Sequence, residues 1–369
     1  MGWHYYGSLH EPEPPPPTRV PALDLARGLA VLFMVFVHVL EEWATLPVQR
    51  ATFGRVVELF GSAPAAPVFM FLMGASVAFS RRRTVGGMLR RGAELLLLGF
   101  LLNFLRGTLP AQIGLSLGLV TAEEIAPYSP WNLLWIVDVL LFAGPALAVL
   151  GLVGLVRRPW AWVALAAIVV VASPHLWGLR SGSPLLDGVL RHLWGTGLMV
   201  SFPVFPWLAF PLVGMAWGTW LRGSDDEERV FLWTLGSGLG LLAAGTGFLV
   251  DRGTQLLGNH WRLEPDGVAW VLGFVGVWLW LCRQAVLRLP DNLVFRTLGW
   301  WSRNVTSFYV VQWLIIAWGT GLAGHQALGA WPTVGCQAGV VVLAHWVTRG
   351  WVRLRRSRRA ASDARLTRS

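Results

Sequence analysis

The feature that most constrains this chain is a series of apolar stretches, each about 20 residues long and almost free of charge. As a helix, a stretch of this length crosses the hydrocarbon core of a bilayer. Charged residues make up 14% of the chain, against about 25% in a soluble domain, and the mean hydropathy is positive. The sequence therefore predicts an all-α, polytopic integral membrane protein.

We expect about ten membrane spans, and the arginines between them set the predicted orientation. All 30 basic residues are arginines, and most of them fall where the positive-inside rule places them when both termini are cytoplasmic. This predicts a bacterial-type plasma (inner) membrane protein. The outer arginines would be Arg50, Arg55, Arg106, Arg180, Arg191, Arg252 and Arg262. The predicted spans are residues 20–43, 64–80, 88–108, 131–156, 159–178, 202–221, 230–250, 267–287, 304–323 and 331–350.

The chain divides into three segments. Residues 1–18 form a proline-rich cytoplasmic tail that we expect to be disordered, residues 19–350 the membrane domain, and residues 351–369 a basic cytoplasmic tail. Membrane topology explains the net charge of +10, so the lipid bilayer is the expected partner and nucleic acid is not. Two cysteines give no disulfide framework. We also expect no metal site, because no helical ligand spacing joins His175, His192, His260 and His325.

The first span carries the strongest signal for chemistry, a polar stripe along an apolar helix. Arg27 and His38 are about three helical turns apart, so they lie on one face, separated by about 16 Å. Asp24 lies one turn before the arginine, and Glu42 one turn after the histidine, next to Glu41. An ionisable group within a membrane span is costly, which makes it a functional candidate by default.

These residue types suit a group-transfer site, although each has a structural alternative. Arg27 offers bidentate donors to a phosphate near the inner surface. His38 can act as a general base near the outer surface, with Glu42 or Glu41 orienting its imidazole. The structural alternatives are an interfacial ion pair between Asp24 and Arg27, and a histidine that only satisfies its polar atoms within a helix bundle.

The motif Leu23-Asp24-x-x-Arg27, with ten residues between Arg27 and His38, resembles the R-x10-H first span of membrane acyltransferases. These include the acyltransferase-3 proteins and the relatives of heparan-α-glucosaminide N-acetyltransferase. Residues 67–76 are similar to the P-x-F-x-F-x-x-G-x-S pattern of the latter group. A late span resembles its N-S-x-x-x-Y-x-x-H pattern through Asn304, Tyr309 and Gln312, the glutamine standing where a histidine is often found.

The resemblance implies transfer of an acyl group, usually acetyl, from cytoplasmic acyl-CoA to a hydroxyl or amine of an extracytoplasmic sugar or glycolipid. Acyl-CoA is then a co-substrate, no cofactor is permanently bound, and a homodimer is left open. The donor side would hold Asp24, Arg27, Gly74 and Ser76. Catalysis would use His38 with Glu42 or Glu41. The substrate side would hold Asp138, Arg191, His192, Asn304, Tyr309 and Gln312.

Several of these residues also have a purely structural interpretation. Gly74 and Ser76 are small residues of the kind that let helices approach closely. Asp138, expected within the span 131–156, must face a cavity or a partner, and a structural hydrogen bond is as good an explanation as a functional one. Asn103 is expected to make a polar contact between helices. The outer pair Arg191 and His192 can belong to an aromatic belt with surface charge or can bind a sugar.

Two other classes of function compete with acyl transfer. Acidic residues and histidines within spans are also typical of proton-coupled transporters, here of a small metabolite or a lipid-linked sugar. The lack of an internal repeat argues against that class, because many transporters are built from inverted halves. The third class is a non-catalytic membrane scaffold, in which Arg27 and His38 would only stabilise the fold.

Overall fold

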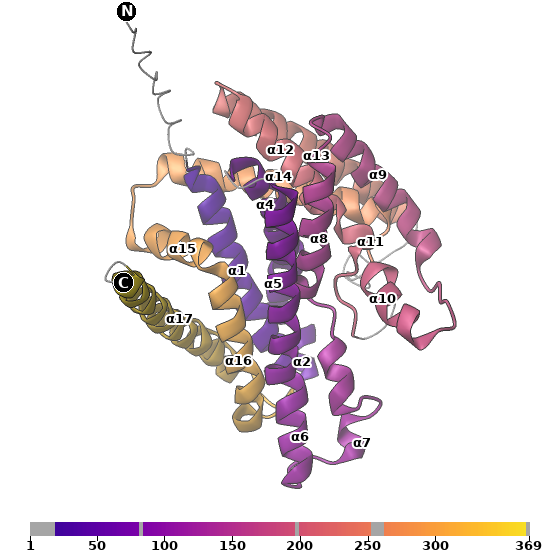
Figure 1. Ribbon diagram of the computed structural model, residues 1–369, viewed down its shortest axis with the longest axis vertical. Coiled ribbons are helices and arrows are strands. Elements are labelled where there is room, and N and C mark those ends of the chain that lie inside the picture. The colour runs from indigo at the N-terminus through magenta and orange to yellow at the C-terminus, as the bar shows by residue number, and fades with distance from the viewer. Residues whose placement is uncertain (1–18, 81–83, 196–198, 252–261, 367–369) are drawn as a thin grey trace, which may run out of the picture.

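The computed structural model describes residues 19–80, 84–195, 199–251 and 262–366, and these parts of the chain are helical with no β-strand. Helices α1 (Pro21–Trp43) and α5 (Val85–Asn103) run along the long axis of the molecule (Figure 1). The last helix, α17 (Ala330–Leu366), lies at the edge of the bundle and continues as a helix beyond its predicted span. The predicted all-α fold is confirmed.

Each predicted span coincides with helical structure, and in the described residues seven stretches are long and apolar enough to cross a membrane. These are Pro21–Trp43, Val85–Ser116, Pro159–Leu176, Val204–Gly223, Glu227–Gly247, Pro265–Arg288 and Val305–Ala323. The shorter apolar helices α4 (Ala66–Phe79) and α8 (Val139–Val153) occupy two further predicted spans. The chain is thus a multi-helix membrane protein, while the count of ten and the sides of the termini stay predictions.

The other elements are further long helices and short pieces that connect them. The long ones are α9 (Pro159–Leu176), α12 (Ala209–Gly223), α13 (Glu227–Asp251), α14 (Pro265–Arg288) and α16 (Val305–Ala323). The short helices are α2 (Leu46–Arg50), α3 (Thr52–Phe60), α6 (Leu109–Ser116), α7 (Ala122–Ile125), α10 (Pro184–Trp194), α11 (Val204–Trp207) and α15 (Leu293–Arg303). Single turns of π-helix cover Gly61–Ala65 and Phe104–Thr108, and a 3₁₀-helix covers Pro130–Trp135.

The predicted span 131–156 is wrong as a single helix. It begins as the 3₁₀-helix, passes through extended backbone, and becomes α8 only at Val139. The interruption has a physical cause, because the backbone of Val137 bonds to another segment instead of continuing a helix. Its N–H donates to the carbonyl of Met199 at 2.8 Å, and its carbonyl accepts from the N–H of Ser201 at 2.9 Å. This break lies beside the candidate site.

Close packing of α4 against α12 explains why small residues recur on both helices. A Cβ added to Gly74 would lie 1.9 Å from the carbonyl oxygen of Pro211. One added to Gly214 would lie 2.0 Å from the carbonyl oxygen of Phe71. The two backbones therefore touch without intervening side chains, as small residues allow in membrane helices. This confirms the packing interpretation of Gly74.

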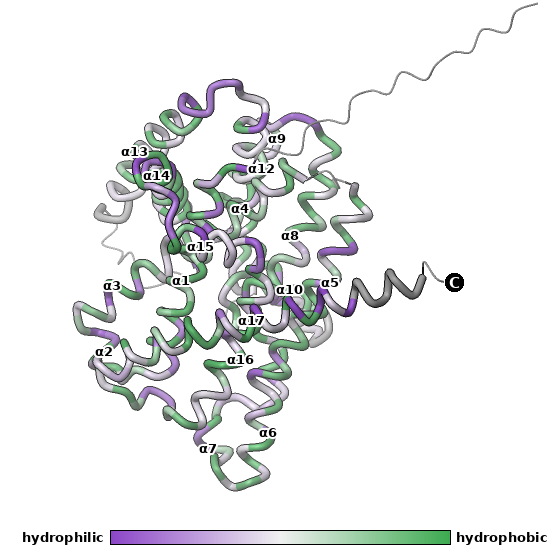
Figure 2. The backbone as a smooth tube through the Cα atoms, turned by 90° about the vertical axis from the view of Figure 1, so that its left-hand side faces the viewer, coloured by the Kyte–Doolittle hydropathy of each residue, from purple (hydrophilic) through white to green (hydrophobic). Residues whose placement is uncertain are grey.

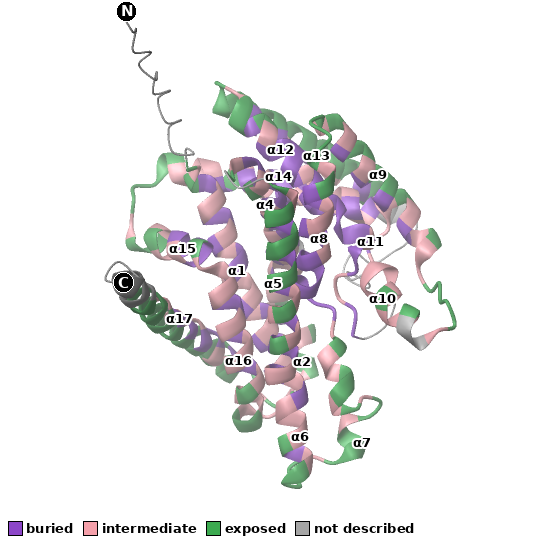
Figure 3. Cartoon of the chain, viewed as in Figure 1, coloured by how far each residue is buried: buried purple, intermediate pink, exposed green. Residues whose placement is uncertain are grey.

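Burial separates the central helices from the peripheral ones. Apolar residues run along most of the helical tube (Figure 2), and buried residues concentrate on α1, α8 and α12 (Figure 3). The outer helices instead expose large apolar side chains, such as Ile168 on α9, Trp233 on α13 and Trp346 on α17, at 59–63%. Lipid is the environment that accommodates such a surface.

Candidate active site

A cavity of about 630 Å³ lies between α1, α16 and the segments packed against them. This volume falls in the range of small-molecule sites, about 300–1,000 Å³. Its polar lining residues are His38, Glu41, Glu42, Ser62, Arg106, Asp138, Ser201, Tyr309 and Thr320. Its aromatic lining also includes Phe69, Phe202, Trp207, Trp270 and Trp313. The cavity thus joins titratable groups from four separate parts of the chain.

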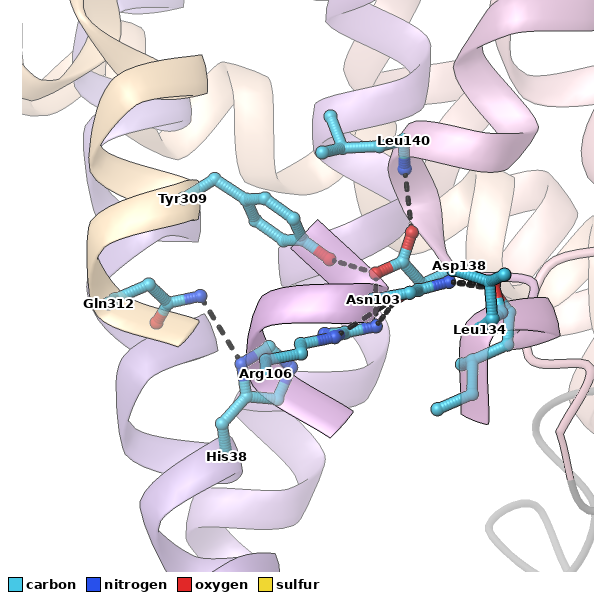
Figure 4. Close-up of polar contacts among 9 residues, drawn as sticks. His38, Asn103, Arg106, Leu134, Asp138, Leu140, Tyr309 and Gln312 are labelled. Carbon is cyan, nitrogen blue, oxygen red and sulfur yellow. Dashed lines mark hydrogen bonds and ion pairs between the residues drawn. The ribbon is translucent and has the colours of Figure 1, made fainter. Parts of the chain in front are cut away.

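The imidazole of His38 is held by two consecutive residues of α16. The ring centroids of His38 and Trp313 are 4.0 Å apart, with an angle of 32° between the planes. Nε2 of Gln312 lies 3.3 Å from Nδ1 of His38 (Figure 4). The structure therefore brings together two of the predicted site residues, His38 and Gln312, from opposite ends of the sequence.

Both predicted glutamates, Glu41 and Glu42, line the same cavity as His38. Oε2 of Glu42 lies 3.8 Å from Nδ1 of His325, which belongs to the loop after α16. The side-chain partner of His38 is Gln312 rather than a glutamate. That Glu42 or Glu41 orients His38 stays a prediction.

Asp138 is the centre of a buried polar cluster at the start of α8. Its Oδ1 accepts from the N–H of Leu140 at 3.1 Å and so caps the helix. Its Oδ2 accepts from Nη2 of Arg106 at 2.6 Å and from the hydroxyl of Tyr309 at 2.9 Å (Figure 4). The ion-paired side chains are only 6% and 8% exposed. Asp138 therefore makes structural hydrogen bonds and faces the cavity at once.

Asn103 connects this cluster to the break before α8. Its Oδ1 accepts from Nε and Nη2 of Arg106 at 3.2 and 2.8 Å. Its Nδ2 donates to the carbonyls of Leu134 and Ile136 at 3.1 and 2.8 Å. The expected polar contact between helices is confirmed, and it satisfies backbone acceptors that the interrupted helix leaves open.

Arg106 is the site residue that sequence analysis missed, because it was grouped with the arginines of the outer surface. A signal was present, since Arg106 and Asp138 are opposite charges within two successive apolar segments. Cζ of Arg106 lies 4.3 Å from the ring centroid of Trp313, the ring that also packs on His38. Trp313 thus links the predicted base to the missed cation.

Arg27 and Asp24 form a second polar cluster, which lies outside the lining of the His38 cavity. Nη2 of Arg27 donates to the carbonyl of Leu72 at 3.1 Å and to the hydroxyl of Ser76 at 2.7 Å. The hydroxyl of Ser302 donates to Oδ1 of Asp24 at 2.7 Å. The polar stripe of the first span is therefore divided between two sites, and at this one the arginine ties α1 to α4.

The comparison with known protein families decides the class of this chain. The family model described as an acyltransferase domain matches residues 20–349, from the start of α1 into α17. The chain belongs to the acyltransferase-3 family. The resemblance seen in its first span is thereby confirmed, and the chain is a membrane acyltransferase. No curated protein matches it.

Two further predicted residues of this acyltransferase have packing or capping contacts. Gly74 lies in the contact of α4 with α12, where a backbone oxygen occupies the space of a side chain. Asn304 joins α15 to α16, and its Nδ2 donates to the carbonyl of Trp300 at 2.9 Å. Their predicted roles at the donor and substrate sides stay predictions.

Arg191 and His192 lie on α10, away from the cavity of the acyltransferase. Arg191 lines a separate cavity of about 340 Å³, and the two cavities have no lining residue in common. Nδ1 of His192 lies 3.0 Å from the carbonyl oxygen of Gly188. Burial lowers the pKa of His192, since it disfavours the charged imidazole.

The outer histidines are scattered where the structure describes them. His325 faces Glu42, His192 lies on α10, and His260 falls outside the described residues. Over residues 19–80, 84–195, 199–251 and 262–366, no group of three or more His, Cys, Asp or Glu side chains is placed to hold a metal ion.

Proposed function

We propose that this acyltransferase moves an acyl group, in the first instance acetyl, from cytoplasmic acyl-CoA to a hydroxyl or amine of an extracytoplasmic sugar or glycolipid. The observation that carries the proposal is His38, a histidine within an apolar helix whose ring forms part of the wall of a cavity. Family membership supplies the reaction type, and the cavity supplies a place for it.

His38 would act as the general base. Its imidazole takes the proton of the acceptor hydroxyl or amine as that atom attacks the thioester carbon. The tetrahedral intermediate then collapses, the carbon–sulfur bond breaks, and the thiolate of coenzyme A leaves with the proton from His38. The acceptor gains the acyl group, so atoms and charge balance without an oxidant or reductant.

Gln312 would set the tautomer of the base. A histidine that accepts a proton at Nε2 must carry its own hydrogen on Nδ1, the atom that faces Gln312. Oε1 of Gln312 is buried and has no hydrogen-bond partner among the described residues. Rotation of the amide by half a turn brings Oε1 to Nδ1, so that Nδ1–H donates to it and Nε2 is left free to act.

Arg27 and Asp24 would mark the donor side. With the N-terminus in the cytoplasm, they lie at the inner end of α1, where Arg27 is about 16 Å along the helix from His38. An extended pantetheine arm can bridge such a distance. Because Arg27 already donates to α4, a phosphate of the donor would have to share this guanidinium.

The cavity wall fits a sugar-like acceptor. Aromatic rings such as Trp207 and Trp270 offer flat faces for a pyranose, and Glu41 and Glu42 offer acceptors for hydroxyl or ammonium hydrogens. A modification of this kind would act on glycans of the cell envelope.

The test is acetyl transfer by protein reconstituted in liposomes, with acetyl-CoA on one side and a panel of free hexoses and hexosamines on the other. His38→Ala should lower turnover by about 10²–10⁴-fold, the usual contribution of a general base. His345→Gln is the matched control, because His345 lies on α17 outside the cavity lining, where its Nδ1 accepts from Nε1 of Trp301 at 3.0 Å.

Three outcomes would count against the proposal. Normal turnover by a folded His38→Ala variant would contradict the assignment of His38 as the general base. Wild-type protein that consumes acetyl-CoA with none of the sugars would remove the acceptor class. Accumulation of a sugar in vesicles without acyl-CoA would instead favour transport.

A further inference from the structure

The guanidinium of Arg106 is held firmly along one edge, while a donor on its other edge is unpaired. Nε and Nη2 donate to Oδ1 of Asn103, and Nη2 also donates to Oδ2 of Asp138. Nη1 is buried and has no hydrogen-bond partner among the residues that the structure describes. The residue is only 9% exposed, and it lines the cavity that contains His38.

An unpaired donor on a buried residue that lines a cavity is a candidate to bind an atom of a ligand. A buried polar group left unpaired costs about 1–3 kcal/mol, and more when it is charged. Three hydrogen bonds and the ring of Trp313 fix the plane of the guanidinium, so Nη1 keeps its direction before any substrate arrives. Donors fixed in advance are the ones that stabilise charge as it develops in a reaction.

The charges around Arg106 indicate which kind of oxygen it would meet. Asp138 neutralises the guanidinium, and Glu41 and Glu42 line the same cavity. A permanent anion would be repelled by these carboxylates. A carbonyl oxygen is neutral when the substrate binds and becomes negative only during the reaction. It can therefore approach the unpaired Nη1–H without being repelled by the carboxylates on binding.

We propose that Arg106 is a further catalytic residue, whose Nη1 donates to the carbonyl oxygen of the acyl group as that oxygen becomes an oxyanion. This rests on the proposed acyl transfer in the His38 cavity. His38 and Arg106 line the same cavity and contact the same ring of Trp313, so the base and the proposed oxyanion donor lie in one part of the cavity wall.

The electron flow is balanced. The acceptor atom bonds to the acyl carbon while His38 takes its proton, and the pair of electrons of the C=O bond moves to oxygen. That oxygen accepts from Nη1 of Arg106. When the pair returns, the carbon–sulfur bond breaks and the thiolate leaves. Asn103 and Asp138 are positioning residues, because they act through the guanidinium.

The test removes the buried pair together, because Arg106→Gln alone would leave Asp138 charged and unpaired. The full-length double variant Arg106→Gln/Asp138→Asn is assayed with acetyl-CoA and with fluoroacetyl-CoA as donors. The acceptor is the most active sugar of the panel, or water if the hydrolysis of the thioester is followed. Fluorine withdraws electrons and stabilises the oxyanion by itself. We expect kcat with acetyl-CoA to fall about 10²–10³-fold, as for loss of an oxyanion donor, and to fall less with the fluorinated donor.

The KM for acetyl-CoA should stay within roughly threefold of wild type, because the interaction forms only in the transition state. An ion pair outside the cavity provides the control: Arg283→Gln/Glu227→Gln removes a contact of 3.7 Å between α13 and α14 and should leave kcat unchanged. Thermal unfolding in detergent verifies the fold of each variant. If the polar pair variant does not fold, Arg106→Met/Asp138→Leu replaces the ion pair by apolar side chains of similar size.

Several results would overturn the proposal. One is a kcat within roughly threefold of wild type in a folded pair variant. Another is an equal deficit with both donors, since an oxyanion donor must matter less when the donor stabilises its own charge. A higher KM for the acceptor at unchanged kcat would make Arg106 a ligand of an anionic acceptor. Wild-type protein that turns over no acyl-CoA would instead contradict the proposed function itself.

Discussion

The two ends of α1 use their polar residues in opposite ways. At the end that holds His38, polar groups surround a cavity, and Nη1 of Arg106 and Oε1 of Gln312 have no partner among the described residues. At the end that holds Arg27, the guanidinium donates to α4 and Asp24 accepts from Ser302 of α15. The first arrangement leaves hydrogen-bonding groups available to a substrate, whereas in the second the hydrogen-bonding groups join neighbouring helices. Substitutions at the two ends should therefore differ in what they change.

The largest effect on stability is expected at Asp138. This residue faces the cavity and also joins segments of the fold, because it caps α8 and pairs with Arg106. Asp138→Leu alone leaves Arg106 buried without its counterion and should lower the free energy of unfolding by about 3–5 kcal/mol. Arg106→Met/Asp138→Leu should recover most of that loss, although it stays inactive. Chemical unfolding in mixed micelles measures both. Equal stability of the single and the paired variant would mean that this ion pair is not coupled energetically.

A packing contact between α4 and α12 should give the next largest effect. Gly74→Ala places a Cβ 1.9 Å from a backbone oxygen of Pro211, so α4 and α12 must separate. Overpacking of this kind costs about 1–3 kcal/mol, measured as a lower melting temperature with kcat per folded molecule unchanged. Gly86→Ala on α5 is the matched control, because its Cβ would meet no atom within 4 Å. A variant of Gly74 that is as stable as this control would contradict the close packing.

At the inner end, Ser302→Ala tests whether the Asp24 cluster is a helix contact or a donor site. If it is a helix contact, the loss should be about 1 kcal/mol of unfolding free energy, the value of one hydrogen bond. Ser237→Ala, which removes a hydroxyl from the surface of α13, provides the baseline. If Ser302→Ala instead raises the KM for acetyl-CoA and leaves stability unchanged, this end of α1 belongs to the binding site for the acyl donor.

The smallest effect concerns pH and the half-buried His192 of α10. Burial lowers the pKa of His192 below its ordinary value of 6.5, so the folded protein binds fewer protons there than the unfolded chain. Its contribution to stability is therefore present above pH 6.5 and is lost as the pH falls through that value toward the lowered folded pKa. Wild type should melt at a lower temperature at pH 5.5 than at pH 8, and His192→Gln should show less of this difference. Identical pH profiles would contradict the burial of a neutral imidazole.

The sequence predicted the helical class and the positions of the helices, because apolar stretches of span length leave few other folds open. It also identified His38, Asp138, Tyr309 and Gln312, which the structure places on or beside one cavity. The periodicity of one helix could not predict that His38 and Arg27, which share a face of α1, belong to two separate sites. That division depends on which neighbouring helix each residue meets.

The role of Arg106 escaped prediction for a related reason. The positive-inside rule treats every arginine as a topological marker, and Arg106 simply counted against the expected orientation. Its partner Asp138 was assigned to the inside of a continuous helical span, residues 131–156. Only the extended backbone between the 3₁₀-helix and α8 brings that carboxylate to a helix start, where it can cap α8 and pair with Arg106.

The interrupted helix before α8 has a consequence for how this family can diverge. Asn103 satisfies the carbonyls of the break and at the same time orients Arg106, while Asp138 caps α8 and neutralises the same guanidinium. A substitution at any of the three positions disturbs both the backbone and the charge balance. We expect positions 103, 106 and 138 to covary across homologues as one inherited unit, even while the acceptor side of the cavity drifts toward new substrates.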